Sequence, residues 1–138
     1  MLDALKPLAK EKNIQIITAT ASKSSEVQAA AKSLVNRVEA IFIGNDNTVV
    51  SGLEALVKVC LKEKIPLFVS DPDSVNRGAL AAYAYDQRQM GEQVGNMVAE
   101  VLKGKNPGDM PVERASNLKF SLNPQTAEHL KITCEIAR

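Results

Sequence analysis

The 138-residue sequence has little of what several functional classes require. Its formal net charge is only +1, with basic and acidic residues intermixed, so it lacks the basic stripe that nucleic-acid binding usually needs. No apolar run approaches the roughly 20 residues that cross a bilayer, and no basic region leads into an apolar stretch at the start, as in a signal peptide. A chain expressed as it stands is therefore expected in the cytoplasm, although a processed exported protein would have the same sequence features.

Catalytic and metal-binding signals are also scarce. His129 is the single histidine and is predicted to lie on the surface of a short C-terminal helix. There is no Gly-x-Ser-x-Gly elbow, no P-loop and no Gly-x-Gly-x-x-Gly after a strand. A metal site built from Asp46, Asp71 and Asp73 would have no histidine or cysteine support. We therefore expect no enzyme, no cofactor and no metal.

The two cysteines do not decide the redox compartment. Cys60 falls on the apolar side of its predicted helix with Val57 and Leu61, which predicts a buried free thiol. Cys134 lies near the C-terminus without an evident partner, and a disulfide between the two stays open as an alternative.

The sequence does contain a regular alternation of strand and helix patterns. Strands are expected at 14–19, 38–43, 67–69, 79–85 and 118–122. Helices are expected at 2–12, 25–36, 48–62, 87–103 and 124–130. Short connections between these elements predict one α/β domain over residues 1–138, a three-layer αβα sandwich with a mainly parallel sheet.

Some local signals refine this pattern. Ser25 and Gln28 have the spacing of a capping box, and Asp86 is a good helix N-cap. Tyr83 and Tyr85 alternate to one side of their strand, so they are predicted to pack in the core or at its rim rather than to form a stacking platform.

Two polar clusters follow successive predicted strands. Asn45, Asp46, Asn47 and Thr48 come directly after the apolar run 41–43 and open the next helix. Ser70 and Asp71 come directly after strand 67–69. In parallel α/β sheets, ligands bind where strands meet helix N-termini, and both clusters would face one crevice.

Each of these residues has two interpretations. Asp46 or Asn47 could simply cap a helix, and Asp71 and Asp73 could shape a turn. Alternatively, a carboxylate of Asp46 or Asp71 could bind an ammonium group while Thr48 and main-chain N–H groups bind a carboxylate. The second interpretation predicts a site for a zwitterion such as an amino acid.

Several of these segments together resemble one protein family. Residues 38–50 with Asp46-Asn47-Thr48-Val49-Val50, residues 65–71, and the stretch Ser74-Val75-x-Arg77-Gly78-Ala79 are similar to substrate-binding proteins of ABC transporters of the tryptophan/tyrosine type. The same family is also similar at three further places: Gly91 with Gln93, Leu102-Lys103-Gly104, and residues 107–113. The resemblance runs from about residue 14 to about residue 125.

The resemblance implies a type I periplasmic-binding-protein fold with two lobes hinged around an amino acid or a similar small ligand. It also implies an extracytoplasmic location and an ABC permease as partner. The expected ligand contacts in this chain are Asn45, Asp46, Asn47, Thr48, Ser70, Asp71 and Asp86. Gln87 and Arg88 stand where the family often has a pair of tyrosines, which makes the hinge side of the site depart from the family pattern.

Family members are about twice as long, so this chain is expected to be the C-terminal lobe of a truncated protein. Residues 79–104 would then pack on the missing lobe, and their exposed apolar faces predict self-association into a homo-oligomer. Three other functions stay open. One is a self-associating fragment without a ligand, and another is the ligand-sensing domain of a LacI-like regulator, which would need a helix-turn-helix that this chain lacks. The third is an α/β hydrolase or transferase, which would need a nucleophile–base pair, and none is visible in the sequence.

Overall fold

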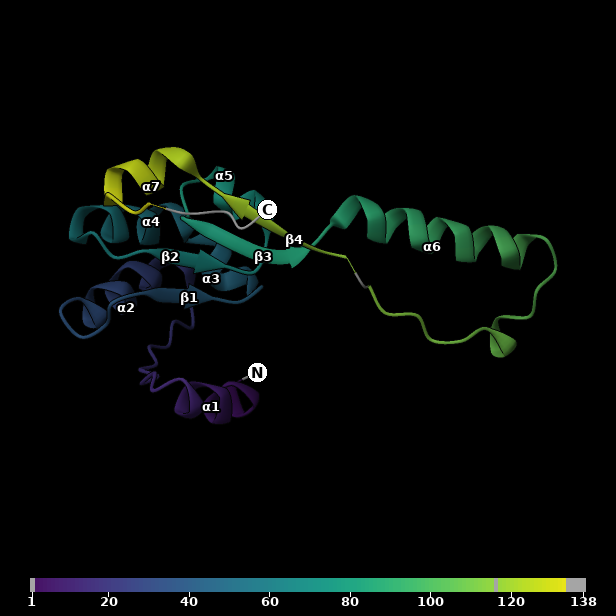
Figure 1. Ribbon diagram of the computed structural model, residues 1–138, viewed down its shortest axis with the longest axis horizontal. Helices are drawn as coiled ribbons and strands as arrows, with labels where there is room; N and C mark the ends of the chain where they lie inside the picture. The colour runs from purple at the N-terminus through teal and green to yellow at the C-terminus, as the bar shows by residue number, and fades with distance from the viewer. Residues whose placement is uncertain (1, 116, 134–138) are drawn as a thin grey trace.

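A four-stranded sheet organises the computed structural model, which describes residues 2–115 and 117–133 (Figure 1). The strands lie in the order β1 (Ile41–Ile43), β2 (Leu67–Val69), β3 (Ala81–Tyr85) and β4 (Leu118–Leu122). The first three are parallel and β4 is antiparallel to β3. The predicted α/β fold with a mainly parallel sheet is confirmed.

Helices connect and flank these strands. They are α1 (Leu2–Glu11), η1 (Ser24–Glu26), α2 (Val27–Leu34), α3 (Asn47–Ser51), α4 (Leu53–Glu63), α5 (Pro72–Asn76), α6 (Gln87–Leu102), η2 (Pro107–Asp109) and α7 (Pro124–Leu130). The helix predicted over 48–62 is divided at Gly52, where a Cβ atom would lie 2.9 Å from the carbonyl oxygen of Ser24 and from Val27. The close approach of the two main chains therefore requires glycine at this point.

The main core covers one face of the sheet. The register places Ile41, Leu67 and Val69 on the same side, and all three are buried. Helices α2 and α4 cover them, and Leu53 of α4 is fully buried (0% exposed). Cys60 lies in this core as a free thiol, as predicted, and burial raises its pKa to about 11. Cys134 lies outside the described residues.

The opposite face of the sheet is only partly covered. There, α7 packs over Leu80 and Ala81 near the start of β3. Farther along the sheet, large apolar side chains are exposed: Phe42, Phe68, Tyr83, Tyr85, Leu118 and Phe120. Tyr83 and Tyr85 were predicted to pack in the core or at its rim, and neither lies in the core: Tyr83 is 66% exposed and Tyr85 is 44% exposed.

The strand predicted over residues 14–19 is not formed. An alternating apolar pattern makes a strand only where another strand offers its main-chain groups. Here β1 is an edge strand that pairs with β2 alone, and residues 14–19 pair with no other described strand. Ile14 and Ile16 are exposed, and the preceding α1 has no buried residue.

The capping box predicted at Ser25 and Gln28 is also absent. A 3₁₀ turn precedes α2, and the carboxylate of Glu26 accepts a hydrogen bond from the main-chain N–H of Ser22 at 2.9 Å. The Glu26 side chain therefore plays the part that the Gln28 side chain was expected to play, because it accepts a main-chain N–H that precedes the helix.

Helix α6 extends away from the sheet as an arm (Figure 1). The chain enters the arm from β3 and returns to β4 through residues 103–117. Val94 and Val98 on α6 are exposed, and none of its residues is buried. Within the described part of the chain, no helix is both long and apolar enough to cross a membrane.

Candidate ligand site at the sheet edge

Three aspartates lie at one edge of the sheet. The parallel strands β1, β2 and β3 all end there, and each leads into a helix. The residue that caps each helix is an aspartate: Asp46 for α3, Asp71 for α5 and Asp86 for α6. The sequence therefore folds so that an aspartate follows the C-terminal end of each of the three parallel strands.

Each aspartate caps its helix through one carboxylate oxygen, Oδ1. Asp46 accepts the N–H of Val49 at 3.0 Å, and Asp71 accepts the N–H of Ser74 at 2.7 Å. Asp86 accepts the N–H groups of Arg88 and Gln89 at 3.0 and 3.2 Å. The capping interpretation is therefore confirmed for Asp46 and Asp86, whereas Asp71, which was predicted to shape a turn, caps the short helix α5. Among the described residues, Oδ2 of each aspartate has no hydrogen-bond partner.

The other predicted contact residues surround these caps. Ser70 donates its hydroxyl to the carbonyl oxygen of Ile43 at 3.1 Å, which ties the end of β2 to the end of β1. Asn45 and Asn47 are exposed, and Thr48 is half-buried in α3. The two predicted polar clusters therefore follow neighbouring parallel strands. The Ser70 hydroxyl already has a structural role, because it donates its hydrogen bond to the end of β1.

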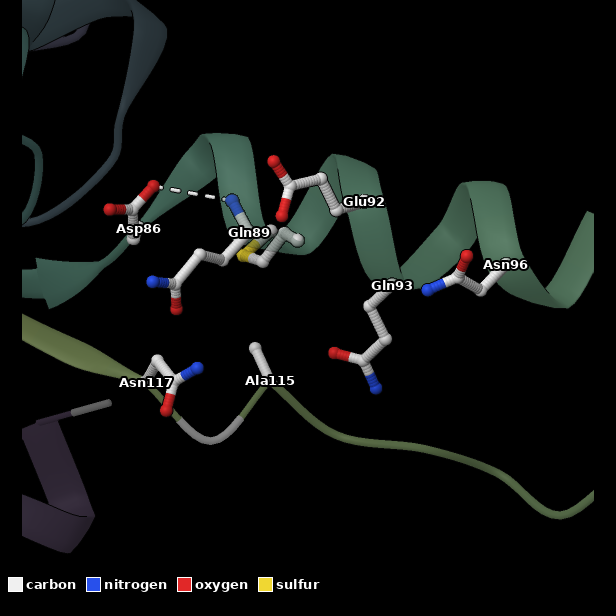
Figure 2. Close-up of a pocket in the computed structure, with 8 residues that line it drawn as sticks. Asp86, Gln89, Glu92, Gln93, Asn96, Ala115 and Asn117 are labelled. Atoms are coloured by element: carbon white, nitrogen blue, oxygen red, sulfur yellow. Dashed lines mark hydrogen bonds between the residues drawn. The ribbon is translucent and has the colours of Figure 1, made fainter.

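A polar cavity of about 330 Å³ lies beside Asp86, between α6 and the returning chain (Figure 2). Figure 2 shows Gln89 and Gln93 pointing from α6 toward the segment that carries Ala115 and Asn117. The residues that line it are Asp86, Gln89, Met90, Glu92, Gln93, Asn96, Ala115 and Asn117. Carboxamides can both donate and accept hydrogen bonds, so this cavity is suited to a polar group.

Sequence reasoning identified only Asp86 of this cavity. Gln89, Gln93 and Asn96 are spaced at i, i+4 and i+7, which places three carboxamides on one side of α6 and could have been noticed. Asn117 could not have been identified from the sequence, because only the antiparallel pairing of β3 and β4 brings it opposite α6. The main-chain N–H of Asp86 donates to the carbonyl oxygen of Asn117 at 3.2 Å at this crossing.

An apolar groove of about 600 Å³ lies farther out on the arm. Val94, Val98 and Leu102 form its α6 wall, and Met110 and Val112 lie on the returning chain. Side chains of this kind are usually covered by another part of a protein.

The candidates for catalysis or metal binding are not assembled into a site. His129 is exposed, as predicted, and its Nε2 lies 3.1 Å from the carbonyl oxygen of Leu61. Among the residues that the structure describes, no three His, Cys, Asp or Glu side chains are grouped closely enough to hold a metal ion.

Comparison with known proteins gives one consistent result. Residues 1–136 match the family described as ABC transporter substrate binding protein. The chain is 35% identical, over 129 residues and 94% of its length, to the tyrosine-binding protein of Clostridioides difficile, of which it covers 37%.

Two solved structures are similar over almost the whole chain. A conserved domain protein of Vibrio cholerae matches with a TM-score of 0.85 and 34% identity, over 97% of this chain and 45% of that one. The ABC domain in complex with L-Trp from Streptococcus pneumoniae matches with a TM-score of 0.83 and 30% identity, over 96% and 46%. The chain therefore spans less than half the length of these relatives.

Proposed function

The chain belongs to the family of ABC transporter substrate-binding proteins, and we propose on this premise that its sheet edge binds an amino acid, preferably an aromatic one. Members of this family bind solutes and are not enzymes. In this proposal the chain forms one wall of a cleft in the solute-binding component of an importer. A second lobe closes the cleft over the ligand from the other side.

The observation that carries the proposal is the set of three aspartates on one edge. Asp46, Asp71 and Asp86 cap the helices that follow β1, β2 and β3 with Oδ1, and the remaining oxygen of each can accept a hydrogen bond from an ammonium group. Asn45, Asn47 and Thr48 supply the neutral donors and acceptors that a carboxylate or side chain requires. The L-Trp complex of the pneumococcal relative supports an aromatic ligand.

The arm supplies the connection to the second lobe. We propose that the apolar residues of α6, within residues 79–104, pack on that lobe, while β3 and β4 serve as the two connections between the lobes. The exposure of the apolar side chains of α6 is consistent with this arrangement, since Val98 is 52% exposed. The complete protein would then act on the extracytoplasmic side of the membrane and deliver its ligand to an ABC permease.

Isothermal titration calorimetry tests the ligand proposal. L-tryptophan and L-tyrosine are titrated into this chain and into the full-length Clostridioides difficile relative, with D-tryptophan as a control. We expect weak binding to this chain and tight binding to the relative. Serine at the relative's positions that align with Asp46 and Asp71 should weaken binding at least about tenfold, because two charge-assisted contacts are lost. Unchanged affinity in both variants would refute the assignment of these residues.

A second candidate function is self-association without a ligand. The observation in its favour is the apolar groove of the arm, which no described residue covers. Two copies of the chain would bury these grooves against each other. Multi-angle light scattering on the wild type and on Val98→Glu, with Val112→Glu as a second variant, distinguishes the candidates. A dimer that dissociates in both variants and no amino-acid binding would favour this alternative.

A further inference from the structure

Arg77 links the two short helices that carry Asp46 and Asp71. It is the C-cap residue of α5, and its side chain reaches the junction of α3 and α4. Nε and Nη2 donate to Oε1 of Glu54 at 2.9 and 2.7 Å. Nη2 also donates to the carbonyl oxygen of Val50, in α3, at 3.1 Å. One guanidinium thus contacts α3 and α4 while its main chain belongs to α5.

The two helices need such a contact because each has only five residues. Isolated helices of this length are unstable in water, since the cost of nucleation is not recovered. Their N-termini are held by the aspartate caps. At the other end, Arg77 donates to one of the last carbonyl groups of α3, where a positive charge is favourable.

The main chain under Arg77 is itself held firmly. Its N–H donates to the carbonyl oxygen of Asp73 at 3.2 Å. The next residue, Gly78, has φ +112°, and a Cβ atom there would lie 2.8 Å from Cγ1 of Val57 in α4. The carbonyl oxygen of Val75 accepts a hydrogen bond from Asn123 at 2.9 Å. The guanidinium therefore projects from a well-fixed base.

We infer that Arg77 is a positioning residue that sets the spacing between Asp46 and Asp71 at the sheet edge. The inference rests on the proposed function, because a ligand held by both aspartates needs them within a few tenths of an ångström of the correct separation. The Arg77 and Glu54 side chains are 37% and 61% exposed, so the pair contributes little to global stability. Its effect should appear in local order and in affinity.

The test compares Arg77→Met and Arg77→Lys with the wild-type chain. Amide hydrogen exchange is followed at Val49 and Ser74, the two N–H groups that the aspartates cap. We expect exchange at both amides to become about two- to fivefold faster in Arg77→Met, in line with the strength of an exposed ion pair, while the unfolding midpoint stays nearly unchanged. Arg77→Lys should recover only part of the protection, because an ammonium group lacks the fork that reaches both acceptors.

Arg37→Met is the matched control. Arg37 also donates to a main-chain carbonyl group near a helix end, that of Ser33 at 3.0 Å, but it lies on α2's side of the core. Exchange at Val49 and Ser74 that stays unchanged in Arg77→Met, or changes equally in Arg37→Met, would overturn the inference.

Titration with L-tryptophan separates this inference from the proposed function. If the wild type binds and Arg77→Met binds two- to fivefold more weakly, both are supported. If the wild type binds and Arg77→Met binds equally well, the positioning role is refuted and the function stands. If the wild type does not bind at millimolar ligand while the amides still respond, the proposed function fails and the link between α3 and α5 stands.

Discussion

Replacing the capping aspartates separates their structural contribution from ligand binding. Asp71→Ala removes the acceptor of the Ser74 N–H, and Ser74 is fully buried (0% exposed). Loss of an N-cap usually costs about 1 kcal/mol, and a buried N–H left without a partner brings the cost to about 2 kcal/mol. Asp46→Ala exposes a half-buried donor to water, so its cost should stay near 1 kcal/mol.

Serine at the same positions should preserve the fold. A serine hydroxyl accepts the same N–H groups, so Asp71→Ser and Asp46→Ser should stay within about 0.5 kcal/mol of the wild type. Urea unfolding followed by circular dichroism measures all four variants, and Asp71→Ala should lower the midpoint by about 1 M. A serine at position 71 that costs as much as alanine, or a larger loss of stability in Asp46→Ala than in Asp71→Ala, would contradict the assigned capping roles.

Three further predictions concern the core beneath the site. Leu53→Ala should lower the free energy of unfolding by about 2–5 kcal/mol in urea denaturation, whereas Leu102→Ala, at a side chain 83% exposed, should change it by less than about 0.5 kcal/mol. Gly78→Ala should cost more than about 1 kcal/mol, because φ is +112° and the new Cβ would meet Val57, and a near-neutral result would contradict the close approach. Burial raises the pKa of the Cys60 thiol to about 11, so the thiol binds its proton more tightly in the folded state than in the unfolded state. The free energy of unfolding should therefore keep its full value below pH 9 and fall as the pH rises from about 9 to 11. Cys60→Ala should remove this part of the pH dependence.

Much of the fold could be predicted because its signals are local. The helix cap Asp86, the apolar strand 67–69 and the alternating strand 118–122 follow from patterns of a few residues, and the structure confirms them. Helix α5 was missed because five residues starting with a proline show too little periodicity to distinguish a helix from a turn. The strand predicted at 14–19 failed because strand formation depends on a distant partner, which a local pattern does not reveal.

The candidate site was predictable in part for the same reason. Asp46 and Asp71 follow two apolar strands, and the rule for parallel sheets brings them to one edge. Asn117 reaches the site only through the pairing of β3 with β4, and Arg77 reaches α4 only through its hydrogen bonds to Glu54. These contacts join residues more than 20 positions apart in the sequence, and no local pattern specifies them.

The central claim is that an amino acid binds at the edge formed by Asp46, Asp71 and Asp86. Titration of the ¹⁵N-labelled chain with L-tryptophan, followed by chemical-shift changes of the main-chain amides, tests it most directly. If the ligand binds there, saturable shifts are expected at Val49, Ser74 and neighbouring amides of α3 and α5. Shifts confined to the exposed sheet face around Phe68, or no shifts at millimolar ligand, would contradict it.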